Sequence, residues 1–303
     1  MEPNANTDDE MFRPGQLGPH FVAFIDHLGQ RERLDRLPPF ARNTQEKDLI
    51  RDSLIRAAQP VLHIRDWFKS YFDGLNVVNP DMTEGMTPEQ RQGFLDLRRM
   101  HFDLLTFSDS VVIAIPIRVD QHHRIKSAMT VSSALQAIAQ VMLTALAHGM
   151  PLRGGIDAGT CLRLTEHEVY GRPLLGAYRL ESTVAEYPRV PVGDGLITLL
   201  EYLRSSPVQH PLDEGAPEIA NDCFGLLCKA PDDGQMMLHF LCDEILKITP
   251  QFAELPPKAL AWIDQQLTEF RQSGNDKLAR RYTRLRGYFA SAGCLSAPDP
   301  TAA

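Results

Sequence analysis

Residues 20–29 read HFVAFIDHLG and predict the first strand of a sheet. The apolar run is short, rich in aromatic and β-branched side chains, and followed by Gly29, which indicates a buried strand over residues 20–27. Asp26 comes near the end of this strand. A carboxylate there loses hydration, so it needs a charged partner, a metal ion, or a helix N-terminus to cap.

A β-hairpin is predicted further along the chain. Its strands are Phe102–Phe107 and Val111–Ile117, and the short turn between them holds Asp109. If the first strand lies beside this hairpin, Asp26 and Asp109 meet at one end of the sheet. Two carboxylates there supply hard oxygen ligands for Mg²⁺ or Mn²⁺ and leave room for a phosphate. Taken alone, Asp109 fits equally well as an ordinary turn residue.

The rest of the chain alternates helices with short strands, which predicts an α+β fold with helices packed on a sheet. Pro60 is expected to break or kink the first long helix. We divide the chain into a flexible arm at 1–18, a core at 19–192 and a C-terminal extension at 193–303 packed on the core. Helices are expected at 43–72, 124–148, 173–186 and 194–205 and in two C-terminal segments, strand pairs at 152–170 and 224–241, and loops at 76–90 and 206–222.

The composition is that of an ordinary globular protein. Of the 303 residues, 43% are apolar and 23% are charged, which excludes a collagen-like or wholly disordered chain. The net charge of −8 argues against broad binding to nucleic acid or acidic membranes, but not against a small anionic substrate. The apolar runs at 21–25 and 111–117 are too short to cross a bilayer, and the acidic N-terminus has no signal-peptide core, so we expect a cytoplasmic protein. Five scattered cysteines indicate reduced thiols.

Four stretches of the chain form an ordered set: FIDHLG at 24–29, FSDSVVI at 107–113, LRGGIDAG at 152–159 and YGRPLLGAYRLESTVAEYPRV at 170–190. The set resembles class III nucleotidyl cyclases, and in particular the pyrimidine cyclases of the Pycsar anti-phage defence systems. The resemblance spans most of the chain and implies a ferredoxin-like sheet with helices packed on it, then a C-terminal β-hairpin and a helical extension. It also implies a homodimer with active sites between the protomers and two Mn²⁺ or Mg²⁺ ions in each site.

The resemblance assigns catalytic and metal-binding roles. Asp26 and Asp109 would bind the metal ions, with the backbone carbonyl of Ile25 as a further ligand. In the implied reaction the ribose 3′-oxygen attacks the α-phosphate of a nucleoside triphosphate, and diphosphate leaves. Arg179, supplied by the partner protomer, would stabilise the transition state.

The resemblance also implies contacts to the substrate phosphates. The turn formed by His27, Leu28 and Gly29 would present backbone N–H groups to these phosphates at a helix start. Apart from the resemblance, Arg172 stands next to a proline and is interpreted either as a phosphate contact across the dimer interface or as an ordinary loop residue.

The chain departs from the purine cyclases at positions that select the base. Leu105 stands where the adenine-selecting lysine is expected, Glu168 lies near the position of its acidic partner, and Leu175 replaces a catalytic asparagine. These differences argue against an adenylate or guanylate cyclase and are compatible with a pyrimidine base. The resemblance favours UTP, and therefore cyclic UMP made as a second messenger during phage infection.

Several alternatives stay open. The substrate could be CTP, or the protein could be a catalytically silent member of the fold that binds a nucleotide. Arg153 is interpreted either as a phosphate contact or as a strand-paired arginine, and Glu181 as a structural ion-pair partner. The basic set of Lys277, Arg280, Arg281 and Arg284 is interpreted as a solvated helix face, and His122–His123 as an exposed helix start.

Overall fold

The computed structural model describes residues 13–35, 37–118, 124–165, 168–208 and 213–294. Its centre is a five-stranded antiparallel sheet in the order β2-β3-β1-β4-β5, so the strand that carries Asp26 lies in the middle. The strands are β1 (Leu17–His27), β2 (Asp103–Phe107), β3 (Ser110–Pro116), β4 (Leu152–Arg163) and β5 (Val169–Gly171).

Helices lie between and after these strands. The chain order β1, helices, β2, β3, helix, β4, with β1 between β3 and β4, is the ferredoxin-like arrangement. The predicted α+β fold is therefore confirmed. The helical elements are α2 (Gln30–Asp35), α3 (Thr44–Leu75), η1 (Pro80–Thr83), α4 (Pro88–Arg98), α5 (Arg124–Ala147), α6 (Arg172–Arg179), η2 (Leu180–Val184), α7 (Asp194–Ser205), α8 (Ala216–Gly225), α9 (Asp243–Leu246), α10 (Pro250–Ala253), α11 (Leu255–Gln272) and α12 (Asp276–Ser291), with a second hairpin of β6 (Leu227–Lys229) and β7 (Met236–Leu238).

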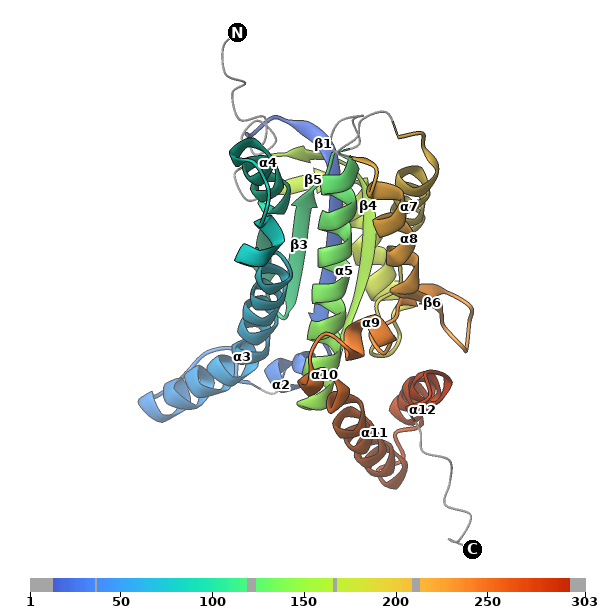
Figure 1. Cartoon of the computed structure of the whole chain (residues 1–303). Coiled ribbons are helices and arrows are strands. Elements are labelled where there is room, and N and C mark those ends of the chain that lie inside the picture. Colours follow the sequence, from blue (N-terminus) through green and yellow to red (C-terminus); the bar gives the residue numbers. More distant parts are fainter. Residues whose placement is uncertain (1–12, 36, 119–123, 166–167, 209–212, 295–303) are drawn as a thin grey trace, which may run out of the picture.

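The two faces of the sheet are covered differently. Side chains alternate along β1, so Phe21, Ala23 and Ile25 enter the large core beneath α3 and α5, and Figure 1 shows α5 crossing this face. Val22 belongs to a smaller apolar cluster beneath α6, with Phe24 packed against it. Asp26 follows the same alternation and lies on the α6 face.

Helix α3 starts where the sequence predicts. Asn43 accepts a hydrogen bond from the N–H of Glu46 at 2.9 Å, and the Glu46 carboxylate accepts one from the N–H of Arg42 at 2.7 Å. The helix continues through Pro60 without a break and bends part-way along (Figure 1). Its buried side chains begin at Val61, so the N-terminal half has no buried side chain.

The loops were expected to be longer than they are. Helix α4 begins inside the expected loop at 76–90, and α8 begins inside the expected loop at 206–222. Both helices are short, with 11 and 10 residues, so each offers few turns in which an apolar period can be recognised. Phe224 lies in α8 rather than in the hairpin. Residues 188–192 form no named strand, and Pro191 and Val192 make isolated bridges with Met237 and Ile156.

The C-terminal extension is continuous with the core. The N–H of Val192 donates to Met236 of β7, and the N–H of Leu238 donates to Val190. One hydrophobic cluster runs from the strands of the sheet to Leu285 and Phe289 of α12. In the expected arm at 1–18, Leu17 and Gly18 are the first residues of β1, and residues 1–12 lie outside the described residues, as do His122 and His123.

Helix α5 is long and apolar enough to cross a membrane by length and composition, although its sequence contains no long uninterrupted apolar run. In this structure 83% of its apolar window is buried inside the protein. It is the central core helix. The five cysteines are free thiols, as expected.

A buried ion pair lies on the α6 face at the far end of the sheet from Asp26. The guanidinium of Arg163 is fully buried and donates to Asp103 at 2.7 Å. The imidazole of His20 lies close enough for both charges to act on it, and its pKa is lowered by burial. This end of the face is therefore charged but internally compensated.

We expect Asp103→Asn to lower the free energy of unfolding by about 3–5 kcal/mol, because it removes the carboxylate that lies 2.7 Å from the buried Arg163 guanidinium. Urea unfolding measures the change. The control is Asp243→Asn, which breaks the exposed pair of Asp243 with Lys247 and should change stability little. A loss in Asp103→Asn no larger than in the control would contradict the prediction.

Candidate functional site

Asp26 is held between the two strands that flank β1. It lies directly opposite Ser110 of β3 on one side and Arg153 of β4 on the other. The Ser110 hydroxyl donates to Oδ1 at 3.0 Å, and Nε and Nη2 of Arg153 both donate to Oδ2 at 3.3 Å. The strand register thus gives Asp26 the charged partner that a buried carboxylate requires.

Glu181 joins this pair from the turn after α6. Its Oε1 lies 2.6 Å from Nε of Arg153. The Nε–H group of Arg153 donates to Asp26. Oε1 of Glu181 is buried, and no described residue donates a hydrogen bond to it. One arginine therefore lies between two carboxyl groups, and it contacts Glu181 as an ion pair without a well-aligned hydrogen bond.

Gly155 allows this turn to lie so close to the sheet. A Cβ atom at this position would be 2.2 Å from the carbonyl oxygen of Ala177 and 2.6 Å from Cβ of Leu180. Only glycine leaves room for α6 and η2 to rest directly on β4. Glu181 reaches Arg153 because of this contact.

Asp109 lies in the tight turn between β2 and β3. Ser108 before it has a φ of 56°, the left-handed conformation of such turns. The carbonyl of Asp109 accepts a hydrogen bond from the N–H of His27 at 3.2 Å, which ties the hairpin turn to the end of β1. Asp26 and Asp109 are close enough for their charges to repel, so they meet at one end of the sheet as the sequence predicts.

The carboxyl groups destabilise one another as anions. Burial raises the pKa of Asp26, and the charge of Asp109 raises it further, against the opposing effects of Arg153 and Ser110. Burial also raises the pKa of Glu181 to about 7, an effect that Arg153 opposes and Asp26 reinforces. Two carboxyl groups thus share the Arg153 guanidinium, the charge of Asp109 acts on both of them, and the surplus negative charge favours binding of a cation or a proton.

The donor set fits a hard divalent cation. Within the described ranges, no group of three or more His, Cys, Asp or Glu side chains is arranged as a metal cluster. Mg²⁺ commonly binds through one or two carboxylates and completes its coordination with water and substrate phosphates. Asp26 and Asp109 match that pattern, and Glu181 adds a nearby carboxyl group that is paired with Arg153.

The other expected residues at the end of β1 are only partly suited to their roles. The side chain of Ile25 is buried in the core on the opposite face from Asp26, so only its backbone could be a ligand. The N–H groups of His27 and Leu28 are already used, by Asp109 and by Pro151 at 3.0 Å. The expectation that these two N–H groups bind phosphate is therefore wrong in this structure. Gly29 has a φ of 89° and leads into α2.

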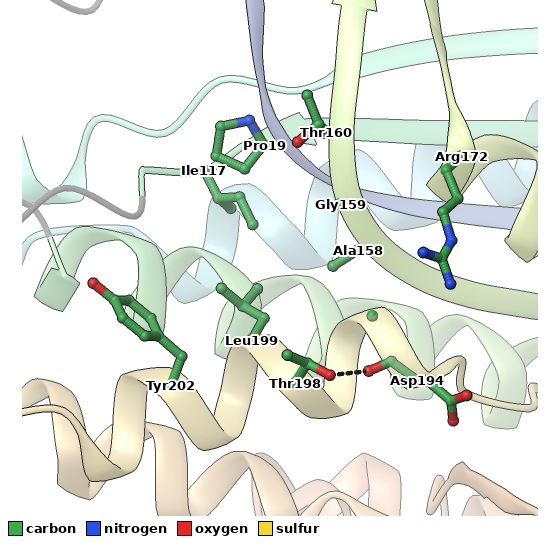
Figure 2. Close-up of a pocket in the computed structure, with 11 residues that line it drawn as sticks. Pro19, Ile117, Ala158, Gly159, Thr160, Arg172, Asp194, Thr198, Leu199 and Tyr202 are labelled. Atoms are coloured by element: carbon green, nitrogen blue, oxygen red, sulfur yellow. Dashed lines mark hydrogen bonds between the residues drawn. The ribbon is translucent and has the colours of Figure 1, made fainter.

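Two expected substrate contacts lie far along the sheet. Glu168 precedes β5, opposite the end of β4, about ten residues and therefore about 30 Å from Arg153. Arg172 begins α6 and lines a separate cavity of about 710 Å³ with Thr160 and Asp194 (Figure 2). Within one chain, neither residue contacts the carboxyl cluster.

Leu105 and Arg179 lie on the α6 side of the sheet. Leu105 is half-buried and packs against the smaller apolar cluster, in register with Val112. Arg179 is exposed at the end of α6, and no described residue lies within ion-pair distance of its guanidinium. Beside it, the exposed side chains of Leu175 and Tyr178 extend the apolar surface outward.

Sequence reasoning placed Arg153 and Glu181 outside the catalytic set. The register of β1 with β4 brings Arg153 opposite Asp26, and a π-helical turn directs Glu181 inward. An alternation count on both strands would have placed Arg153 on the face of Asp26. No sequence signal indicated the π-helical turn.

Comparison with known proteins gives one structural likeness. No protein-family model and no curated protein matches the chain. A solved structure described as a bacterial light-regulated adenylyl cyclase aligns with 80% of this chain and 99% of its own, at 11% identity and a TM-score of 0.37. This is a distant likeness.

Glu181→Gln should change the pH dependence of the free energy of unfolding, measured with EDTA present to remove metal ions. Glu181 binds its proton near pH 7 when folded and near pH 4.5 when unfolded, so the folded state holds more protons between these values. Its contribution to the free energy of unfolding is full below pH 4.5 and is lost as the pH rises through 7. We expect the variant to lack this loss and to gain stability relative to the wild type across the window.

Urea unfolding across this pH range makes the measurement. Glu201→Gln, at an exposed position on α7, is the control and should follow the wild type. Parallel curves for the wild type and Glu181→Gln would contradict the prediction.

Proposed function

We propose that the protein is a nucleotidyl cyclase that converts a pyrimidine nucleoside triphosphate to its 3′,5′-cyclic monophosphate and diphosphate. The observation that carries the proposal is the meeting of Asp26 and Asp109 at one end of the central strands. The ferredoxin-like topology and the four ordered sequence motifs support the same function. UTP is the favoured substrate and CTP the alternative.

In this proposal Asp26 and Asp109 hold Mn²⁺ or Mg²⁺, two ions in each site. Such ions lower the pKa of the ribose 3′-hydroxyl and neutralise the triphosphate. Asp26 and Asp109 position the substrate by their fixed places on the sheet. Ser110 orients the Asp26 carboxylate through its hydrogen bond at 3.0 Å. Arg153 balances the carboxylates before substrate arrives, through contacts of 3.3 Å to Asp26 and 2.6 Å to Glu181.

The proposed active form is a homodimer. Leu175 and Tyr178 on α6 and Phe107 on the hairpin are large apolar side chains with exposed fractions of 48%, 49% and 77%. Exposed apolar surface of this kind favours a protein interface, and the proposed occupant is a second copy of this chain. Arg179 lies on the same outward side, without an ion-pair partner among the described residues, so it is free to enter the partner's site.

The base would meet an apolar wall rather than a charged one. The side chain of Leu105 lies on the same face of the sheet as Asp26 and contributes no hydrogen-bonding group. Such a surface lacks the lysine that selects adenine in the purine cyclases, which is compatible with a pyrimidine base. The proposed product is a cyclic pyrimidine nucleotide that acts as a second messenger in anti-phage defence and activates a separate effector protein.

We expect purified protein with Mn²⁺ to convert UTP, and not ATP or GTP, to a cyclic monophosphate detected by mass spectrometry. Asp26→Asn and Asp109→Asn should abolish the product, because each removes a metal-binding carboxylate. Asp66→Asn, at an exposed position on α3, is the matched control and should keep full activity. A cyclic CMP product would select CTP, a cyclic purine would overturn the pyrimidine assignment, and an active Asp109→Asn protein would exclude the metal assignment.

Arg179→Ala should lower kcat by about 10²–10³-fold with little change in KM, as expected for a residue that stabilises transition-state charge. If Arg179 acts across the interface, mixing inactive Asp26→Asn with inactive Arg179→Ala restores one intact site in each mixed dimer. Random mixing then recovers about a quarter of wild-type activity. No recovery on mixing, with dimers demonstrated by light scattering, would place Arg179 in its own protomer's site.

A further inference from the structure

A second cavity lies between the sheet and the C-terminal helices. Its volume is about 640 Å³, within the range of sites that hold small organic ligands. One wall is the turn of His27, Leu28 and Gly29 at the end of β1, and the opposite wall comes from α11 and α12. Asp26, Asp109 and Glu181 do not line it.

The helical wall is aromatic. Trp262 and Phe270 come from α11 and Tyr282 from α12. The ring of Tyr282 lies 5.7 Å from that of Trp262 and 5.1 Å from that of Phe270, so the three rings form a continuous surface. Aromatic surfaces of this kind bind planar rings by stacking and edge contacts.

The lining carries one arginine, Arg281, and one glutamate, Glu186. Arg281 of α12 is half-buried in the lining, and no described residue lies within ion-pair distance of it. Glu186, the acidic residue in the lining, already pairs with Arg284, which also lies 3.4 Å from Asp232. Arg281 is therefore a cation of the lining without an ion-pair partner among the described residues, and a guanidinium binds carboxylate and phosphate groups well.

We propose that this cavity binds a planar aromatic anion, of the class of a nucleoside monophosphate, with its ring on the Trp262–Tyr282 surface and its anionic group on Arg281. The site is separate from the carboxyl cluster and needs no metal ion. In this assignment Arg281 is a ligand-binding residue rather than part of a solvated helix face.

The cavity is connected to the candidate active site through the wall that Leu28 and Pro151 form. Leu28 donates its N–H to Pro151 at 3.0 Å, and both residues line the cavity. Asp26 and Arg153 are each two residues away along the chain. A ligand that fixes this turn would therefore influence the position of Asp26, which makes the cavity a regulatory site. This regulatory role rests on the proposed cyclase function, whereas the binding itself does not.

The experiment uses Trp262 as a reporter. Trp67 and Trp262 are the two tryptophans of the chain, and Trp67 stacks on His63 outside the cavity lining. Trp67→Phe therefore leaves fluorescence from the cavity alone. In EDTA, UMP and AMP are titrated against uridine and adenosine, which carry the same bases without the phosphate. We expect saturable quenching, with the monophosphates binding at least about tenfold more tightly.

Two neighbouring arginines give a matched comparison. Arg281→Gln should remove the advantage of the monophosphates, and Arg280→Gln should keep it, because Arg280 is exposed and outside the lining. The absence of saturable quenching by any of the four compounds, or equal effects of the two substitutions, would overturn the proposed site. Asp26→Asn should leave the quenching unchanged; its loss would assign the nucleotide to the carboxyl cluster instead.

Cyclase assays with and without UMP separate the two proposals. A change in turnover that Arg281→Gln abolishes and Arg280→Gln preserves supports the regulatory role. Quenching in a protein that cyclises none of the four nucleoside triphosphates would overturn the cyclase function and leave the binding site standing. Quenching with unaltered turnover would overturn the regulatory role.

Discussion

The pairing of Arg153 with Asp26 across β1 and β4 is the interaction on which the candidate site depends. Asp26 occupies the central strand, where neighbouring strands and α6 exclude water on most sides. A lone carboxylate in that place would be costly, so the opposing strand supplies a cation. Because Arg153 also contacts Glu181, the same cation determines how the turn after α6 lies on the sheet.

The two ends of the α6 face show how differently one sheet can treat buried charge. At one end Arg163 and Asp103 form a close pair at 2.7 Å, and the apolar cluster separates it from the other end. At the other end, Arg153 serves more than one carboxyl group and its contacts to Asp26 are longer. A buried carboxylate with its own cation has its charge neutralised inside the fold. A cluster in which carboxyl groups outnumber the cations can still attract a further cation. The difference separates a structural site from one suited to chemistry.

Local patterns in the sequence were sufficient for the elements that carry the carboxylates. The strand around Asp26 and the hairpin around Asp109 follow from apolar runs and a short turn, and their meeting needs only that the strands be neighbours. The partners could not be found in this way. Arg153 requires the register of β4, and Glu181 requires a π-helical turn that no residue pattern predicts. Glu168 lay far away because β4 is long, and α8 was missed because a helix of ten residues offers few turns in which an apolar period can be recognised.

Gly155 has a mechanical consequence. With no side chain between them, the backbone of β4 and the turn after α6 are in direct contact, and neither can slide without moving the other. Arg179 and Glu181 sit on either side of Leu180, the residue pressed against that glycine. The side chain of Glu181 faces inward to the chain's own carboxyl cluster, and the side chain of Arg179 faces outward. In a dimer that shares its sites, a displacement of Arg179 on one side of the interface would be transmitted through this rigid turn to Glu181 on the other side.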